Sequence, residues 1–237
     1  MNILKQGVEY FGLCLLSEQE KAFEIYKDML IEWNKKINLT AIKDEKDIDI
    51  RHFLDSISVI SVLGDYKEGT SLIDIGSGAG FPGIPLKIML NGLDLALMDS
   101  IGKKVSFLQE VINELGFQNA KAINSRAEDL AINPDFREKF DYATARGVSK
   151  LSVVSEYCLP FVKIGGKFIS MKLFDADEEI NEAKVAISAL GGEISQVKKV
   201  KIPFSDIMHS LIVIDKVSGT PLKYPRKPGK AAKNPIK

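Results

Sequence analysis

Short apolar runs alternate with segments of helical periodicity from Thr70 onward, and this alternation constrains the fold more than any other feature of the sequence. It is typical of βαβ units, in which helices cover both faces of a mainly parallel sheet. The pattern predicts five parallel strands, at residues 71–75, 95–99, 119–124, 141–145 and 166–171. It predicts helices between and after them, at residues 84–90, 103–115, 151–161 and 177–190.

Two further extended runs follow Gly191 and Gly192, at residues 193–202 and 210–216. The loop between them contains Pro203 and is too short for a crossover helix, so we expect the two runs to pair antiparallel. The predicted fold class is therefore α/β, a doubly wound, Rossmann-like sheet of seven strands with an antiparallel pair at one edge.

The residues before the sheet predict a separate helical region. Apolar side chains recur at three- and four-residue steps behind Ser17, a candidate N-cap with Glu20 three positions on. A second helix is expected over residues 45–63. These patterns divide the chain into an N-terminal helical extension, a sheet domain and a basic C-terminal tail, at residues 1–64, 65–217 and 218–237.

Composition limits the class of protein. The chain of 237 residues is 45% hydrophobic and 27% charged, which excludes disorder throughout. It has neither an apolar run of roughly 20 residues that could span a bilayer nor a secretory signal, so we expect a cytoplasmic protein. We also expect a monomer. Cys14 and Cys158 lie in apolar surroundings far apart in the sequence, so each is predicted to be a small core residue.

Charge is unevenly distributed although the net charge is zero. The segment 223–237 contains six basic residues and no acidic one, a pattern that favours contact with nucleic-acid phosphates. The predicted RNA contacts are Lys223, Arg226, Lys227 and Lys230 of this segment, with Lys103 and Lys104, and Lys35 and Lys36, as weaker candidates. Each of these lysine pairs could instead belong to a solvated helix face.

A glycine-rich loop, Asp74-Ile-Gly-Ser-Gly-Ala-Gly-Phe-Pro-Gly83, follows the first strand and opens a helix. Glycines let the backbone turn sharply and approach a ligand closely, so a nucleotide-shaped ligand is implied. The spacing of Gly78, Gly80 and Gly83 also fits the dinucleotide fingerprint, so the loop by itself leaves the ligand open.

Acidic side chains near this loop favour S-adenosylmethionine. Asp74 can order the loop and meet a cationic amino group, whereas it would repel a pyrophosphate. Asp99 ends the second strand, where a carboxylate reaches ribose hydroxyls in either kind of fold. Glu128 and Asp129 follow the third strand and are placed to contact adenine, or alternatively to cap a helix.

Taken together, these motifs resemble the GidB/RsmG family of bacterial methyltransferases, which modify position 7 of a guanine in small-subunit ribosomal RNA. The resemblance covers nearly the whole chain. It rests on the segments at residues 33–40, 51–56, 74–85, 98–104, 126–128, 145–146, 165–166, and 223–229. The chain departs from the family pattern at Gly147, Leu173 and His209, all on the expected substrate face.

The resemblance implies a fold, a cofactor and a set of binding residues. The fold is that of the seven-stranded S-adenosylmethionine-dependent methyltransferases, and the partner is small-subunit ribosomal RNA or the small ribosomal subunit. The cofactor positions, taken with the residues argued from the loop, are Asp74, Gly76, Gly78, Phe81, Asp99, Ala127, Glu128 and Arg146.

The residue inventory suits methylation of a ring nitrogen. Position 7 of guanine already carries an in-plane lone pair, so no protein nucleophile or base is required and the enzyme mainly positions its reactants. No Cys, His or carboxylate cluster has metal spacing, and no metal is predicted. Both His52 and His209 are predicted to pack or hydrogen-bond, and Arg146 is the candidate catalytic residue, because a guanidinium can contact the cofactor carboxylate or guanine acceptors.

Two alternatives remain. A nicotinamide-dependent oxidoreductase fits the overlapping glycine pattern but not Asp74. A non-enzymatic RNA-binding protein could use the same fold as a scaffold.

Overall fold

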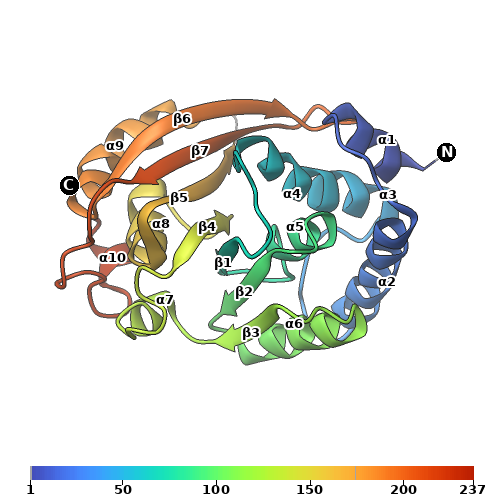
Figure 1. Ribbon diagram of the computed structural model, residues 1–237, viewed down its shortest axis with the longest axis horizontal. Helices are drawn as coiled ribbons and strands as arrows, with labels where there is room; N and C mark the ends of the chain where they lie inside the picture. The colour runs from blue at the N-terminus through green and yellow to red at the C-terminus, as the bar shows by residue number, and fades with distance from the viewer. Residues whose placement is uncertain (1, 174) are drawn as a thin grey trace.

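Seven strands form one sheet in the computed structural model, which describes residues 2–173 and 175–237 (Figure 1). The strands are β1 (Ser71–Ile75), β2 (Asp94–Asp99), β3 (Ala120–Asn124), β4 (Phe140–Arg146), β5 (Val162–Leu173), β6 (Gly192–Lys201) and β7 (Met208–Lys216). Their spatial order is β3-β2-β1-β4-β5-β7-β6. β1 to β5 pair in parallel, whereas β7 pairs antiparallel with both β5 and β6. The predicted doubly wound sheet is confirmed.

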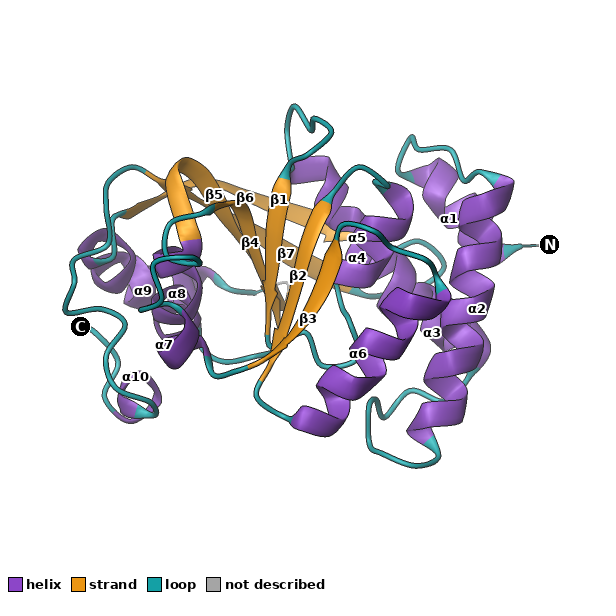
Figure 2. Cartoon of the chain, turned by 60° about the horizontal axis from the view of Figure 1, so that its bottom comes forward, coloured by secondary structure: helices purple, strands orange, loops and turns teal. Residues whose placement is uncertain are grey.

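One helical layer covers the face of the sheet that carries Leu72, Leu95 and Leu97 (Figure 2). It holds α5 (Gly83–Met89) and α6 (Gly102–Glu114), and outside them the N-terminal helical extension. The extension consists of α1 (Ile3–Tyr10), α2 (Ser17–Asn34), α3 (Glu45–Ile48), the π-helical turn η1 (Asp49–Leu54), α4 (Asp55–Ile57) and η2 (Ser58–Val62). Its buried aromatic side chains join the same core, so the extension is packed onto the sheet domain.

The opposite face carries Ile73 and Ile75, as the alternation of side chains along a strand requires. It is covered by α7 (Ala127–Leu130), α8 (Leu151–Cys158), η3 (Leu159–Phe161), α9 (Asp177–Ala189) and, in the C-terminal residues, α10 (Lys230–Lys233) (Figure 2). The two termini lie on opposite sides of the sheet.

The winding of the sheet changes direction between β1 and β4, because β2 and β3 lie on one side of β1 and the later strands on the other. Ligands of open α/β sheets bind outside the carboxyl ends of the strands at such a point. The topology therefore predicts a ligand site formed by the residues that follow β1, β2, β4 and β5.

Most predicted elements agree with the structure to within one or two residues, but several details differ. β5 is longer than predicted, and α1 and α10 were not expected. Ser17 is the first residue of α2 and does not cap it; the Gln19 side chain instead accepts the Leu16 N–H at 2.9 Å. The helix expected over residues 45–63 is a continuous helical segment that passes through α, π and 3-10 geometry.

The two cysteines differ in burial. Cys158 is fully buried in α8, as predicted, but the prediction for Cys14 is wrong, because its side chain is exposed. Cys14 lies in the turn between α1 and α2, where Leu15 takes the buried position. Within residues 2–173 and 175–237, no helix is long and apolar enough to cross a membrane.

Candidate functional site

The glycine loop after β1 adopts backbone angles that side chains rarely tolerate. Gly76, Gly78 and Gly80 have φ values of 70°, 60° and 99°. A Cβ at Gly76 would lie 2.9 Å from Val148 Cγ2, whereas a Cβ at Gly78 would meet nothing nearer than the Gly76 carbonyl at 3.9 Å. The loop is therefore closed over Gly76 and open over Gly78, which fits the cradle expected for a nucleotide-shaped ligand.

Asp74 lies beneath this loop with 0% exposure. Its Oδ2 accepts the Gly83 N–H at 3.1 Å and its Oδ1 accepts the Thr144 hydroxyl at 3.2 Å. Burial raises the pKa of Asp74 to about 6, and these two donors oppose that rise. These hydrogen bonds support the predicted role of Asp74 in ordering the loop. The loop covers the Asp74 carboxylate, so no exposed carboxylate surface is left for the predicted contact with a bound amine.

Asp99, at the end of β2, joins the loop to the next helix. Its Oδ2 accepts the Gly78 N–H at 3.0 Å and its Oδ1 accepts the Ile101 N–H at 2.9 Å. Asp99 is buried, although part of its surface remains open. The predicted ribose contact is thus adjacent to the open part of the glycine loop.

Ala127 and Glu128 begin α7, after β3. Both are buried, and Glu128 Oε1 accepts the backbone N–H of Gly229 at 3.0 Å. The residue predicted to contact adenine therefore also holds the C-terminal residues against the sheet domain, a contact that sequence reasoning missed.

Arg146 ends β4 and is held from three sides by the N-terminal helical extension. Its Nη1 donates to Asp55 Oδ2 at 2.8 Å and to the Arg51 carbonyl at 3.2 Å, and its Nη2 lies 3.1 Å from His52 Nδ1. The guanidinium carbon also lies 4.8 Å from the centre of the Phe81 ring. Arg146 thus takes part in an ion pair, and it brings Phe81 and the extension to one point.

His52 is a neutral hydrogen-bonding residue, consistent with its prediction as one that packs or hydrogen-bonds. Burial, followed by the positive charge of Arg146, lowers its pKa to about 3. Because a guanidinium can only donate, His52 Nδ1 must accept, and Nε2 then donates to Thr40 Oγ1 at 2.8 Å. The ring stacks on Phe81 with centroids 4.3 Å apart.

His209, on β7, donates from Nδ1 to Asp55 Oδ1. Asp55 therefore receives a hydrogen bond on each of its two oxygens while its side chain is 1% exposed. The structure places Asp55 and His52 in the site although neither is among the predicted site residues; the only sequence signal was the segment 51–56 of the family resemblance.

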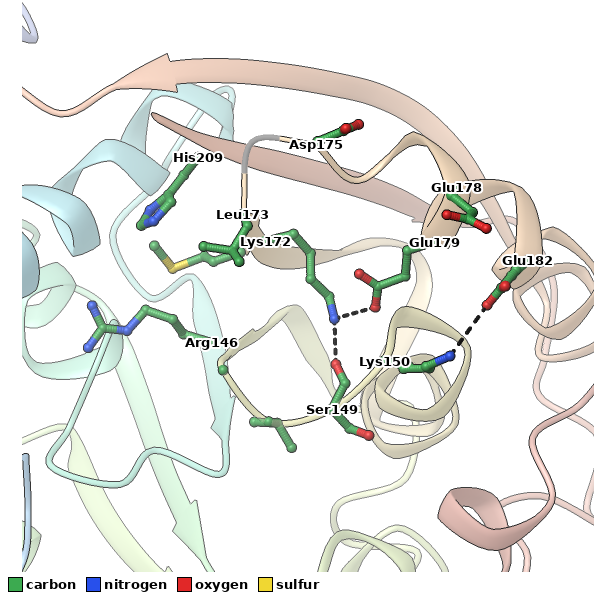
Figure 3. Close-up of a pocket in the computed structure, with 13 residues that line it drawn as sticks. Arg146, Ser149, Lys150, Lys172, Leu173, Asp175, Glu178, Glu179, Glu182 and His209 are labelled. Atoms are coloured by element: carbon green, nitrogen blue, oxygen red, sulfur yellow. Dashed lines mark hydrogen bonds and ion pairs between the residues drawn. The ribbon is translucent and has the colours of Figure 1, made fainter. Parts of the chain in front are cut away.

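A cavity of about 690 Å³ opens at the carboxyl ends of β4 and β5 (Figure 3). Arg146 and His209 lie on the side nearest the extension, and the acidic residues of α9 lie on the opposite side. Lys172 Nζ pairs with Glu179 at 2.6 Å within the cavity wall. The complete lining is Arg146, Gly147, Val148, Ser149, Lys150, Met171, Lys172, Leu173, Asp175, Glu178, Glu179, Glu182 and His209.

Val148 connects this cavity with the glycine loop, because it lines the cavity and packs over Gly76. The three departures from the family pattern, Gly147, Leu173 and His209, all line the cavity. The predicted substrate face is therefore a physical cavity that adjoins the predicted cofactor loop.

The residues predicted to contact RNA differ in exposure and in their ion pairs. Lys103, Lys223, Lys227 and Lys230 are exposed and Lys104 is half-buried. Arg226 is instead committed to an internal ion pair: its Nε donates to Glu156 Oε1 at 2.9 Å and its Nη2 to Oε2 at 2.6 Å. The weaker candidates Lys35 and Lys36 both pair with Glu32.

The basic C-terminal residues are not a free tail. Pro225 and Ala231 are buried, and Arg137 donates to the carbonyls of Thr220 and Tyr224. Lys216, itself 1% exposed, also pairs with Glu138 beside this segment. The segment docks on α7 and α8 and presents its lysines from an ordered surface. In the described part of the chain, no group of three His, Cys, Asp or Glu side chains is arranged to hold a metal ion.

Comparisons with known proteins identify relatives over nearly the whole chain. Residues 19–208 match the family described as rRNA small subunit methyltransferase G, GidB. The chain is 50% identical to the ribosomal RNA small subunit methyltransferase G of Alkaliphilus oremlandii over 100% of this chain and 98% of that protein. The protein of the same name from Alkaliphilus metalliredigens is 49% identical, over 99% and 98% of the two chains.

The fold has solved relatives at low sequence identity. A SAM dependent methyltransferase from Aquifex aeolicus is similar with a TM-score of 0.53 and 18% identity, over 78% of this chain and 97% of that one. At this identity the likeness concerns the fold alone. By its sequence over nearly its whole length, the chain belongs to the rRNA small subunit methyltransferase G family.

Proposed function

We propose that this protein transfers a methyl group from S-adenosylmethionine to position 7 of a guanine in small-subunit ribosomal RNA. Family membership supports the rRNA methyltransferase activity, since the relatives carry that name. The structural observation that carries the proposal is the cavity of about 690 Å³ that meets the glycine loop at Val148. A cavity of this size accommodates a nucleoside-sized group.

The cofactor would be held by the residues around the glycine loop. Bound S-adenosylmethionine supplies a methyl group on a positively charged sulfur, which is open to direct displacement. Gly76 and Gly78 provide close backbone approach, and Asp99 orders the loop from the end of β2. The proposed cofactor set also includes Phe81, Ala127, Glu128 and Arg146, while Asp74 orders the loop from beneath it.

The protein's own contribution to the reaction is positioning and exclusion of water. The ring nitrogen has its lone pair available, so no side chain needs to remove a proton before attack. Cys158, a possible nucleophile by type, is buried in α8, and burial raises the pKa of its thiol well above the usual range. Arg146 is the residue we propose at the boundary between cofactor and guanine, because its guanidinium can bind a carboxylate or the guanine acceptors.

RNA binding is proposed for five surface lysines, of which Lys104 is half-buried and the others are exposed. Lys103, Lys104, Lys223, Lys227 and Lys230 would contact phosphates, which gives affinity without sequence selectivity. Selectivity would then come from RNA shape and from the fit of one unstacked guanine in the cavity. We propose that the chain acts in the cytoplasm as a monomer, without metal, on small-subunit RNA or the assembled small subunit.

The test is methyl transfer from labelled S-adenosylmethionine to purified small-subunit RNA and to intact small subunits, followed by mass mapping of the product. We expect label at position 7 of one guanine, and the better acceptor identifies the substrate form. Cofactor binding without transfer to either acceptor would reject the proposal. RNA binding with no binding of S-adenosylmethionine would support the non-enzymatic alternative, and binding of NAD instead would support the oxidoreductase.

A further inference from the structure

The N-terminal helical extension reaches the cavity wall by contacting Arg146, through the Asp55 carboxylate, the Arg51 carbonyl and the His52 ring. We infer that Asp55 is a positioning residue that holds Arg146 at the cavity wall, which makes the extension a working part of the active site. The inference rests on the proposed function. It assigns a role to a residue outside the sheet and to a region whose purpose the sequence leaves open.

Three residues of one helical segment contact a single guanidinium. The Arg51 carbonyl, the His52 ring and the Asp55 carboxylate all contact Arg146, at 3.2, 3.1 and 2.8 Å. Arg51 and His52 lie in the π-helical turn η1, and Asp55 follows it directly. π-helical turns are rare and recur at functional sites, so this geometry is consistent with a site that needs side chains in unusual register.

The Asp55 carboxylate is itself fixed in place by its hydrogen-bond partners. Its two oxygens receive hydrogen bonds from Arg146 on β4 and His209 on β7, two strands separated in the sheet by β5. With 1% of its side chain exposed, the carboxylate is largely shielded from competing water. Low effective dielectric strengthens such charge-assisted bonds, so the guanidinium plane is confined to one orientation.

Arg146 keeps donor capacity for a ligand. A guanidinium has five N–H donors, and the contacts to Asp55, Arg51 and His52 use three of them within the described residues. Its side chain is 19% exposed and lines the cavity together with His209. The guanidinium therefore lies at the cavity wall with two N–H donors that these contacts do not use.

The test compares Asp55→Asn with Asp49→Asn. Both substitutions remove one carboxylate charge from neighbouring turns of the same helical segment, and both break one ion pair, since Asp49 pairs with Lys27 at 3.0 Å. Only Asp55 contacts Arg146. Each variant is assayed for methyl transfer to small-subunit RNA, for cofactor binding by calorimetry and for unfolding in urea.

We expect Asp55→Asn to lower kcat/KM by about 10- to 100-fold, because small displacements of a positioned group cost that much. Asp49→Asn should stay within about twofold of wild type, the change expected of an ion pair remote from the chemistry. The decisive readout is the double variant Asp55→Asn with Arg146→Ala. If Asp55 acts through Arg146, the double variant loses no more activity than Arg146→Ala alone.

Equal activity of Asp55→Asn and Asp49→Asn would overturn the inference, as would losses that multiply in the double variant. If Asp55→Asn does not fold, His209→Ala takes its place, because it frees one oxygen of the same carboxylate. We expect a smaller loss of about 3- to 10-fold that disappears in the Arg146→Ala background, and a loss that persists there overturns the inference. Absence of transfer by the wild-type chain would instead reject the proposed function itself.

Discussion

A buried ion pair attaches the N-terminal helical extension to the sheet domain, and another attaches the C-terminal segment. In each case an arginine pairs with a carboxylate whose side chain is 1% exposed. Asp55 of the extension holds Arg146 of the sheet at 2.8 Å, whereas Glu156 of the sheet domain holds Arg226 of the C-terminal segment at 2.6 Å. The sheet domain thus supplies the arginine of the first pair and the carboxylate of the second, and the two pairs lie on opposite sides of the sheet.

The difference between the pairs lies in what surrounds them. Glu156 binds Arg226 in a bidentate manner and also accepts its backbone N–H, so the pair is complete in itself. Asp55 shares its charge between Arg146 and His209, and the arginine faces a cavity. The same ion-pair chemistry therefore anchors a segment in one place and, by our inference, positions a reactive site in the other.

The largest expected effect is the loss of stability when each arginine is replaced by alanine. Arg226→Ala leaves the buried Glu156 charge without a cation, so we expect the free energy of unfolding to fall by about 3–5 kcal/mol. Arg146→Ala should cost less, about 1–3 kcal/mol, because Asp55 keeps the hydrogen bond from His209. Urea denaturation of both variants at neutral pH measures the difference, and equal losses would contradict the view that Asp55 has a second partner of consequence.

A third buried carboxylate, Asp74, sharpens the comparison because its hydrogen bonds come from the neutral donors Gly83 and Thr144. Burial raises its pKa in the folded state to about 6, above the unfolded value of 3.8. The native state then binds the proton more tightly than the unfolded chain between these two pH values. Its contribution therefore favours the fold below about pH 4 and is lost as the pH rises to about 6.

The loss amounts to about 3 kcal/mol across that window, from the free energy of a pKa shift of this size. Asp74→Asn should lack this term. The measurement is the difference in unfolding free energy between wild type and Asp74→Asn from pH 4 to pH 7, which cancels other titrating groups such as His52. A constant difference would show that Asp74 ionises in the native state much as it does in the unfolded chain.

Replacing each arginine by lysine separates charge from geometry. Arg146→Lys keeps the charge but cannot reach Asp55, His52 and the Arg51 carbonyl together, so we expect kcat/KM to fall by more than about tenfold. Arg226→Lys should leave methyl transfer within about twofold, since its pair lies away from the cavity. Steady-state kinetics on small-subunit RNA test both, and comparable losses in the two variants would remove the functional distinction between the pairs.

The smallest expected effect concerns the exposed lysines of the C-terminal segment. Replacing both Lys227 and Lys230 by alanine should change the unfolding free energy by less than about 0.5 kcal/mol. It should lower the slope of log RNA affinity against log salt by about two, one for each phosphate that is no longer neutralised. Lys198→Ala, on the edge strand β6, is the control, and a slope unchanged from this control would exclude the segment from RNA binding.

Local pattern was sufficient for the architecture. The strand β1, the glycine loop after it and the antiparallel pairing of β6 with β7 were all predictable, because apolar alternation and loop length act over a few residues. Predictions of helix ends were less accurate, as at Ser17, because the capping residue depends on which side chain reaches the free N–H. Cys14 was misplaced because apolar neighbours in sequence do not decide which side chain of a turn faces the core.

By itself, the sequence determined the fold class, the family and the positions of the candidate cofactor residues, since these depend on short motifs. Only the tertiary structure decided which charges meet. Arg146 and Asp55 are 91 residues apart, and Arg226 and Glu156 are 70 apart. Such pairs form only when the packing of the helical layers brings two buried surfaces together. The basic C-terminal residues, which read alike in sequence, were thereby divided into one anchor and several exposed lysines.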